Sequence, residues 1–537
     1  MDKKIIITLM LLVSFSKVIA QKLPYPVIFI HGLNSNDKTW NAMKNALINN
    51  YSLVNGGNLN VSLNYDNNLA SSNKNIYPTV RADIAFYSDL STISVGDFYS
   101  VNFDINNLGQ LYPSESNNSF IDVLSNESAI TKQGAALRHI IQLVLQKTNR
   151  DKVILFGHSM GGLCAREYLQ NPVNWTEPNV NHHVAKLITT GTPHLGSDAI
   201  GGQIVGVDLR SEAMRDLKST YNNSGANGVY LFGGNELNSI MNDTSNNYYN
   251  IDVNCDGLGN GGLIVGLNQK LPQYDLDYSC IIGTGALGLG DIAVNTDSAN
   301  INNVYTNLTT NIFTTAVLHN SLPSQLYPNM RGLDEPNVYE IAYEIGYEIL
   351  YVGFITEQSS ISPYTLDYDD YKFNVTNNSQ INLVVNNALP FPIYARFLNS
   401  SYTQVGTTLT INSGNQFLSQ NLFSGQYYLE IYGTPTSSSY QIPYTFGLTS
   451  TLSNENLVSD NSFIVYPNPT TSKIFVTSKE NVGTYEIYNT LGQKVGDGAF
   501  NDSLDDKELD LSNLQNGLYI LNFKGINFNK TVKIIKQ

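Results

Sequence analysis

A serine between two glycines is the first place where this chain could do chemistry. Ser159 is the centre of a Gly-x-Ser-x-Gly pattern at residues 157–161. The apolar run 152–156 predicts a short buried strand before it, and residues 163–169 predict the start of a helix after it. A serine on such a sharp turn holds its hydroxyl out over the edge of a sheet, where it can attack a carbonyl carbon. The pattern predicts nucleophilic catalysis by Ser159, with an ordinary serine in a glycine-rich turn as the alternative.

Attack by a serine leaves a negative charge on the carbonyl oxygen, and backbone N–H groups usually stabilise that charge. The N–H of Met160, which directly follows the serine, is one expected donor. Residues 25–30 predict a buried strand that ends in His31 and Gly32, so the N–H of Leu33 is the second expected donor. The alternative is that His31 and Gly32 only end a strand.

A general base must take the proton of the serine hydroxyl. For a serine on this kind of turn, the chain order is serine, then acid, then histidine. Four of the 7 histidines follow Ser159: His182, His183, His194 and His319. The first three leave no room for another strand, an acid loop and a further strand. We therefore expect His319, after the predicted strand 311–318, to be the base, with a histidine in a surface loop as the alternative.

An acid must orient the imidazole of the base and stabilise its cationic form. The apolar run 279–284 predicts a strand on the serine side of His319, and Asp291 lies on the loop that follows this strand. We expect Asp291 to be this acid. Asp297 is the second choice, because the segment contains many carboxylates.

The elements around these residues alternate between strands and helices. Residues 99–104 and 184–190 predict strands, and residues 134–148 predict an amphipathic helix with apolar side chains on one face. This alternation predicts a mainly parallel sheet flanked by helices. Chemistry in such a sheet lies at the carboxyl ends of the strands.

Residues 22–355 resemble the secreted bacterial lipases and esterases of the α/β-hydrolase superfamily. The matching pieces are residues 29–32, the turn 157–162, the segment 191–196, and Asp291 with the later pair Ser298 and Ala299. The resemblance implies the α/β hydrolase fold and hydrolysis of carboxylic esters, commonly lipid-like ones, without an organic cofactor. The stretch 200–272 departs from the family pattern, and we expect it to form a lid or another insertion.

This insertion contains the opening of a calcium loop. Three of its residues carry oxygens at alternate positions: Asp252, Asn254 and Asp256. Gly257 permits the sharp turn, but Leu263 stands where the closing glutamate is usual. A structural Ca²⁺ would therefore need another ligand, such as Asp275 or Asp277. A solvated turn of Asn and Asp residues is the alternative.

The chain has 3 cysteines. Cys164, in the predicted helix after the serine, is expected to be a small buried thiol. Cys255 and Cys280 either form a disulfide in an oxidising compartment or remain separate, because spacing alone does not show whether they meet.

Beyond the α/β region the composition changes. Residues 336–351 predict a helix that closes the first domain, and residues 356–360 predict a linker. Residues 362–450, with short strands between Asn, Ser and Gly turns, predict an all-β sandwich. The run 367–373 is similar to the pre-peptidase C-terminal domains of secreted bacterial hydrolases. The tyrosines of this region either bind a polymer or pack in the core and at strand edges.

Residues 462–537 resemble the C-terminal sorting domain of type IX secretion. The matching pieces are residues 466–469, 485–489, 491–495, 514–521 and 530–536. The resemblance implies a second small sandwich, interaction with the type IX secretion machinery, and passage across the outer membrane of a Gram-negative bacterium with removal of this domain. A generic terminal sandwich is the alternative.

Residues 1–20 predict a signal peptide, with Lys3 and Lys4 before an apolar run and a small-residue cleavage pattern that ends at Ala20. The apolar run 5–15 is shorter than the roughly 20 residues that cross a bilayer, and an N-terminal anchor is the alternative. No other stretch predicts a transmembrane segment. Lys and Arg number 30 against 45 Asp and Glu, and no basic run occurs, which argues against a nucleic-acid partner.

These observations predict a secreted or surface-attached serine hydrolase that cleaves carboxylic esters, with lipid esters as the expected substrates. A non-catalytic surface adhesin that keeps a hydrolase scaffold is the alternative of a different class. Acyl transfer or amide cleavage would use the same residues.

Overall fold

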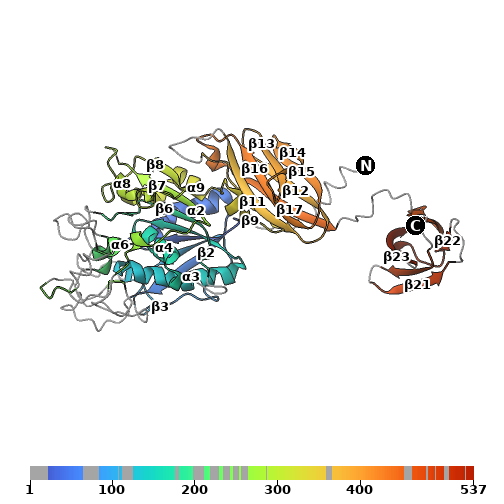
Figure 1. Ribbon diagram of the computed structural model, residues 1–537, viewed down its shortest axis with the longest axis horizontal. Helices are drawn as coiled ribbons and strands as arrows, with labels where there is room; N and C mark the ends of the chain where they lie inside the picture. Colours follow the sequence, from blue (N-terminus) through green and yellow to red (C-terminus); the bar gives the residue numbers. More distant parts are fainter. Residues whose placement is uncertain are drawn as a thin grey trace. The chain divides into compact units, whose positions relative to one another are not determined.

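The computed structural model divides the chain into two compact units, Met1–Thr451 and Leu452–Gln537 (Figure 1). The predicted signal peptide, residues 1–20, lies outside the described residues. Within the described part of the chain, none of the helices combines the length and apolar character needed to cross a membrane. The structure describes residues 22–63, 84–106, 108–111, 125–175, 181–197, 211–217, 229–233, 242–245, 253–254, 264–285, 287–357, 366–452, 463–478, 482–489, 492–500, 507–525 and 528–537.

The first unit is built on an eight-stranded sheet with the order β3-β2-β4-β1-β5-β6-β7-β8. All neighbouring strands pair in parallel except β2 and β3, which are antiparallel. The predicted mainly parallel sheet is thus confirmed. The strands are β1 (Val27–Ile30), β2 (Asn55–Ser62), β3 (Ala85–Phe86), β4 (Phe98–Asn102), β5 (Val153–His158), β6 (Val184–Thr190), β7 (Asp277–Gly283) and β8 (Asn311–Thr315).

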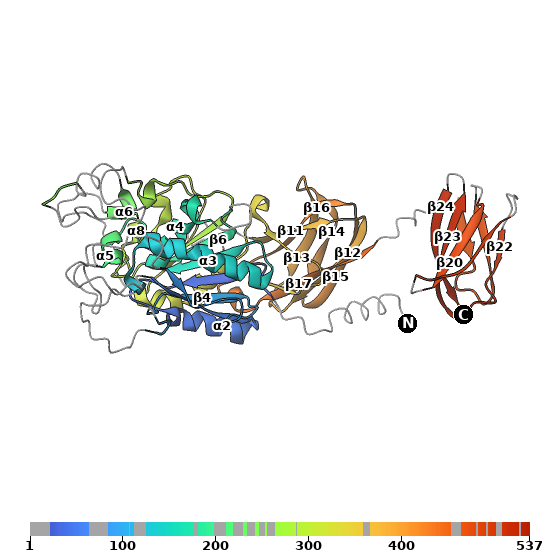
Figure 2. The same cartoon turned by 90° about the horizontal axis from the view of Figure 1, so that it is seen from below.

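Helices cover both faces of this sheet (Figure 2). Phe29 of β1 shares a core with Leu47 and Met330, whereas its neighbour Ile28 shares a second core with Ile141. This division follows from the strand geometry, because successive side chains point to opposite faces. The helices are α2 (Asn41–Tyr51), α3 (Ile130–Thr148), α4 (Met160–Gln170), α5 (Glu212–Asp216), α6 (Val229–Phe232), α8 (Thr296–Ala299) and α9 (Leu326–Leu333), with 3-10 turns that include η1 (Asp37–Trp40) and η9 (His319–Ser324).

A β-sandwich completes the first unit. Its sheets have the orders β10-β17-β12-β15 and β14-β13-β16-β11-β9. The strands are β9 (Tyr343–Glu344), β10 (Tyr351–Gly353), β11 (Asp367–Val375), β12 (Ser379–Asn387), β13 (Ile393–Asn399), β14 (Gln404–Ile411), β15 (Gly414–Leu422), β16 (Gly425–Gly433) and β17 (Tyr444–Leu452). One apolar core runs from Phe29 in the α/β part through Tyr351 to Phe446 in the sandwich.

The predicted helix 336–351 is wrong. The segment forms a 3-10 turn, η10 (Tyr339–Ile341), and then the strands β9 and β10, which pair with strands of the sandwich. Tyr343 lies opposite Tyr371, and the N–H of Ile345 donates to the carbonyl of Lys372 at 2.9 Å. Aromatic and β-branched residues suit strands, so tertiary pairing overrides the helical spacing of the apolar residues.

The second unit contains two antiparallel sheets with the orders β18-β19-β22 and β21-β20-β23-β24. Ile474, Ile487 and Leu521 belong to one buried core that the two sheets share. The predicted second small sandwich is confirmed. Its strands are β18 (Phe463–Tyr466), β19 (Lys473–Ser478), β20 (Thr484–Asn489), β21 (Lys494–Ala499), β22 (Lys507–Asp510), β23 (Gly517–Gly525) and β24 (Phe528–Lys536).

Candidate active site

Ser159 is the single residue between β5 and α4, and it lies on the turn predicted from the sequence. Its backbone has φ 53° and ψ −129°, a sparsely populated region for a residue with a side chain. The two flanking positions must be glycine, because neighbouring backbone atoms lie too close for a Cβ. A Cβ at Gly157 would lie 2.4 Å from the nitrogen of Gly162, and one at Gly161 would lie 2.5 Å from the carbonyl oxygen of His31. The strained turn is thereby held against β1.

Three of the predicted residues meet at the carboxyl ends of the strands. The hydroxyl of Ser159 lies 2.8 Å from Nε2 of His319, and Nδ1 of His319 lies 2.8 Å from Oδ2 of Asp291. The His319 side chain is 14% exposed and that of Asp291 is 0% exposed. The three side chains therefore form one series of hydrogen bonds. The histidine and the serine are partly exposed to solvent, whereas the carboxylate is fully buried.

The backbone around Asp291 fixes its carboxylate. Oδ1 accepts from the N–H groups of Ala293 at 3.1 Å and Val294 at 2.7 Å, which leaves Oδ2 for the imidazole. The N–H of His319 donates to the backbone oxygen of Asp291 at 3.0 Å. Because a carboxylate accepts, Nδ1 of His319 carries the proton and Nε2 presents its lone pair to the serine hydroxyl.

The second-choice acid, Asp297, lies elsewhere. It is exposed in α8, and none of its described contacts is with His319. Its neighbour Ser298 has a structural role, because its hydroxyl donates to the carbonyl of Gly196 at 2.5 Å and accepts from the N–H of Leu195 at 3.1 Å. The segment after β6 is thus fastened to the loop that carries Asp291.

The peptide between Gly32 and Leu33 is oriented by His31. Nε2 of His31 accepts from the N–H of Phe103 at 3.0 Å, so Nδ1 carries the proton and donates to the carbonyl of Gly32 at 2.8 Å. In a trans peptide the N–H points away from the C=O, so the Leu33 N–H points away from His31. A Cβ at Gly32 would lie 3.3 Å from Oγ of Ser159, which shows how near this peptide comes to the serine.

The peptide between Ser159 and Met160 is oriented by a backbone hydrogen bond at the start of α4. Its carbonyl accepts from the N–H of Gly162 at 3.1 Å, so the Met160 N–H points in the opposite direction. Met160 is the first residue of α4, where backbone N–H groups have no partner within the helix. Neither this N–H nor that of Leu33 donates to another described residue. Leu33 and Met160 thus remain the expected donors to a negatively charged oxygen.

His158 is a part of the site that the sequence analysis missed. Its Nε2 lies 3.1 Å from the backbone oxygen of His319, and the two imidazole rings have centroids 4.8 Å apart. Since a carbonyl only accepts, Nε2 of His158 carries a proton. Burial, and then the neighbouring His319, lower the pKa of His158 well below its usual value. His158 is therefore a neutral donor, and a histidine inside a glycine-serine pattern gives no signal of this role.

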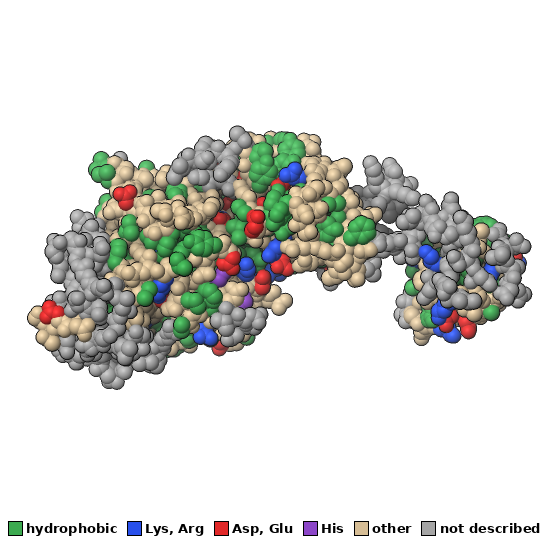
Figure 3. All heavy atoms as spheres, in the orientation of Figure 1, with side chains coloured by type: hydrophobic (Ala, Val, Ile, Leu, Met, Phe, Trp, Pro, Cys, Tyr) green, Lys and Arg blue, Asp and Glu red, His purple; other side chains and the backbone are tan. Residues whose placement is uncertain are grey.

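Apolar side chains line a cavity formed by the neighbours of Asp291 and His319 in the chain. The cavity has a volume of about 480 Å³ and is lined mainly by the loop that carries Asp291, together with Leu318, the residue before His319. Four exposed apolar residues line it: Leu287, Leu289, Ile292 and Leu318. Hydrophobic side chains are also visible over the region of β8 and α8 in Figure 3. Ile292 has φ 81°, a strained value for a β-branched residue.

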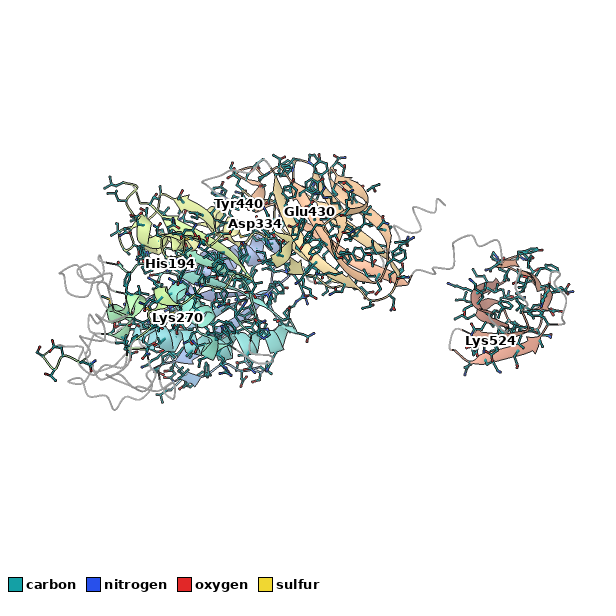
Figure 4. The ribbon with its side chains drawn as sticks, viewed as in Figure 1. His194, Lys270, Asp334, Glu430, Tyr440 and Lys524 are labelled. Atoms are coloured by element: carbon teal, nitrogen blue, oxygen red, sulfur yellow. The ribbon has the colours of Figure 1, made fainter. Side chains whose placement is uncertain are left out.

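The described parts of the insertion 200–272 are fastened to the α/β domain. Lys132 of α3 lies 2.8 Å from Glu212, and Lys270 lies 2.9 Å from Glu167 of α4. Figure 4 labels Lys270 beside this helix. Leu231 shares a core with Met160. The insertion thus packs on the side of the site that holds the Met160 N–H, and its function as a lid remains a prediction.

Two further expectations concern this insertion. Asp252 and Asp256 lie outside the described residues, so the predicted calcium loop at Asp252, Asn254 and Asp256 is described only at Asn254. Cys280 is a buried free cysteine whose thiol donates to the carbonyl of Ala299 at 2.9 Å. Of the two alternatives for Cys255 and Cys280, the free thiol of Cys280 supports the one without a disulfide, and Cys255 itself lies outside the described residues. Cys164 is buried and free, as expected.

Comparison with family models gives two matches. Residues 24–242 match the PGAP1-like alpha/beta domain, and residues 464–537 match the secretion system C-terminal sorting domain. The chain thus carries an α/β-hydrolase domain and, after the intervening sandwich, a type IX sorting domain. The sorting domain supports secretion or attachment to the cell surface. Comparison with curated proteins found no match.

Solved structures resemble parts of the chain. The product of the gene lin2722 of Listeria innocua is 14% identical, with a TM-score of 0.31, over 56% of this chain and 89% of that one. Carboxylesterase CesB (YbfK) of Bacillus subtilis is 10% identical, with a TM-score of 0.26, over 59% and 85%. The pre-peptidase C-terminal domain of a Bacillus anthracis collagenase is 20% identical, with a TM-score of 0.18, over 22% and 99%.

Proposed function

We propose that this chain is an exported serine hydrolase that cleaves carboxylic esters with apolar acyl or alcohol groups. The observation that supports it most is the continuous hydrogen-bonded chain from Ser159 through His319 to Asp291. A nucleophile, a base and a buried acid in this order are the parts that acyl transfer through a serine requires.

In the proposed first step, Oγ of Ser159 attacks the ester carbonyl carbon while Nε2 of His319 takes the hydroxyl proton. The carbonyl π electrons move to the oxygen, and the N–H groups of Leu33 and Met160 stabilise the charge. One such donor is typically worth about 3 kcal/mol in the transition state. The carboxylate of Asp291 stabilises the imidazolium that forms.

In the second step, His319 gives its proton to the departing alcohol oxygen as the ester C–O bond breaks, which leaves an acyl group on Ser159. Water then attacks the acyl carbon of this acyl-enzyme while His319 takes a proton from the water. His319 returns that proton to Oγ of Ser159 as the bond between Oγ and the acyl carbon breaks, and the carboxylic acid product leaves. The mechanism uses only residues of this chain and water. His158, which stays neutral, adds no positive charge beside the imidazolium.

The surroundings of His319 favour an apolar substrate. Leu287 and Leu289 are 86% and 75% exposed at the cavity of about 480 Å³ beside the site. Exposed apolar side chains that line a cavity gain free energy when an apolar ligand covers them, at roughly 25 cal/mol per Å² buried. We therefore propose lipid-like esters as the substrate class.

Export is proposed to take place in two stages in a Gram-negative bacterium. The signal peptide 1–20 would carry the chain across the inner membrane. The sorting domain would then engage the type IX secretion machinery for passage across the outer membrane, and it would be removed from the mature protein. The protein would be released or remain attached to the cell surface.

The test is hydrolysis of chromogenic esters of increasing acyl length by the wild type, Ser159→Ala and Ser321→Ala. Ser321 is an exposed serine on the turn that carries His319, so its variant is a matched control. We expect Ser159→Ala to be inactive and Ser321→Ala to retain activity. An inactive wild type would favour the adhesin, and faster cleavage of amides or faster transfer to an acceptor alcohol would favour an amidase or an acyltransferase.

A further inference from the structure

A buried group of carboxylates lies where the α/β part meets the β-sandwich. Asp334 and Glu335 directly follow α9, whereas Asp369 belongs to β11 of the sandwich. One side-chain oxygen of each residue lies within 4.8 Å of the other two. The residues are 2%, 2% and 0% exposed. Figure 4 labels Asp334 between the two parts of this unit.

The register of β11 turns a fourth carboxylate in the same direction. Residues two apart on a strand share a face, so Asp367 and Asp369 point to the same side as the buried Tyr371. The strand is fixed along its whole length by antiparallel pairing with β16 and by the short parallel strand β9. Asp367 accepts the N–H of Thr356 at 2.7 Å, which fastens the segment after β10 to this face.

The nearby cation is already engaged. Nζ of Lys186, on β6, lies 2.7 Å from Oδ2 of Asp277 and donates to the backbone carbonyl of Asp334 at 2.5 Å. Lys186 also lies within electrostatic range of Asp334 and Glu335, so this one ammonium group is shared among at least three carboxylates. Burying more like charges than the nearby counterions can offset is strongly unfavourable.

One carboxylate oxygen of Glu335 and one of Asp369 have no hydrogen-bond donor in the described part of the chain. Oε2 of Glu335 and Oδ1 of Asp369 are buried and have no partner among the described residues. The other oxygen of Asp369 accepts from the hydroxyl of Tyr444 at 2.5 Å. The hydroxyl of Tyr343, which is 1% exposed and within electrostatic range of Asp334 and Glu335, likewise has no partner in the described part of the chain. Buried oxygens are normally satisfied, so these indicate a ligand.

We propose that Asp334, Glu335 and Asp369 bind a calcium ion that joins the α/β domain to the β-sandwich. Ca²⁺ is bound by oxygen ligands at about 2.4 Å, so two oxygens on the same ion are at most about 4.8 Å apart. The separations in this group fall within that limit. The ligand set contains only oxygen, which favours Ca²⁺ over zinc or copper.

The ion explains why acids from two parts of the unit converge in an apolar core. The site is separate from the motif at Asp252, Asn254 and Asp256. It also goes beyond the proposed ester hydrolysis, because its ligands do not contact Ser159, His319 or Asp291.

The first experiment is thermal unfolding of the full chain after removal of metals with EDTA, with and without millimolar CaCl2. We expect Ca²⁺ to raise the Tm of the wild type by several degrees, because an ion that binds only the folded state stabilises it. The same concentration of MgCl2 should raise it less. No rise with CaCl2 would overturn the proposal, and an equal rise with MgCl2 would overturn the assignment to calcium.

Variants locate the site. Asp369→Asn and Glu335→Gln preserve shape and should abolish the rise in Tm. Asp370→Asn, the next position on β11 and on its other face, should keep it, as should the double variant Asp252→Asn with Asp256→Asn. A rise that persists in both Asp369→Asn and Glu335→Gln, or that disappears only in the 252/256 variant, would overturn the proposal.

Terbium luminescence gives a readout that does not depend on folding stability. Tyr371 and Tyr444 lie beside the site with hydroxyls 2.8 Å apart, so excitation of tyrosine should sensitise bound Tb³⁺. We expect a signal from the wild type that CaCl2 displaces. Its loss in Glu335→Gln supports the site, and an undiminished signal in both carboxylate variants contradicts it.

Discussion

His158 donates a hydrogen bond from Nε2 to the backbone oxygen of His319, at 3.1 Å, while their rings pack with centroids 4.8 Å apart. A neutral, buried histidine thus supports the backbone of the residue that would move protons. His158 is the last residue of β5 and directly precedes Ser159. The end of β5 therefore positions both the nucleophile and a side chain that supports the base.

The hydrogen bond from His158 to the backbone of His319 predicts a lower kcat when the His158 donor is removed. His158→Phe keeps a ring but loses the hydrogen bond, which is worth roughly 1 kcal/mol, so we expect kcat to fall about fivefold with little change in KM. His158→Gln can place an amide donor near the Nε2 position and should recover part of the loss. Equal kcat values for the phenylalanine variant and the wild type would contradict the contact's role in positioning.

The acid can be assigned by comparing two aspartates. Asp291→Asn retains the shape but loses the charge and favours the wrong tautomer of His319, so kcat should fall by about three to four orders of magnitude. Asp297→Asn changes an exposed residue and should change kcat less than twofold. Steady-state kinetics on one chromogenic ester measures both, and the reverse ranking would move the acid to Asp297.

Ile292 predicts a conflict between stability and substrate binding. Its φ of 81° is strained, and glycine adopts this conformation freely, so Ile292→Gly should raise the free energy of unfolding by about 1 kcal/mol. The same change removes an apolar side chain from the cavity and should lower kcat/KM more for long-chain than for short-chain esters. Chemical denaturation and a chain-length series test the two effects. A destabilised variant with unchanged chain preference would contradict this account.

Buried histidines predict a loss of stability in acid. Burial, and then the guanidinium of Arg166, hold the pKa of His194 well below its usual value. Below about pH 6.5 the unfolded chain binds a proton at this position that the folded chain does not, so His194 lowers the free energy of unfolding as the pH falls. The effect approaches about 1.4 kcal/mol per pH unit. His194→Gln should therefore lose less stability than the wild type between pH 7.5 and 5.5, and parallel denaturation midpoints would contradict this.

The parallel sheet and the geometry of the turn could be predicted because buried apolar runs and glycine spacing are local signals. The strand predicted at 152–156 became β5, and the predicted helix 134–148 became α3. His319 was reached by elimination along the chain, without any contact information. The hydrogen bonds that it makes in the structure needed coordinates.

Nonlocal contacts explain what the sequence did not predict. The segment 336–351 has helical spacing, yet it pairs with β11 and β17, which follow it in the chain. The support given by His31 and His158 depends on the backbone of distant residues. Asp334, Glu335 and Asp369 converge only because the sandwich packs against the α/β part. No spacing pattern indicates any of these relationships.

The central claim is that Ser159 is a nucleophile activated by His319. Its most direct test is reaction of the full chain with an organophosphonate probe, followed by mass spectrometry of the peptides. The account predicts one adduct, on Ser159, that His319→Ala slows strongly and Ser159→Ala abolishes. Absence of an adduct in the wild type, or an adduct on another serine that persists in Ser159→Ala, would contradict it.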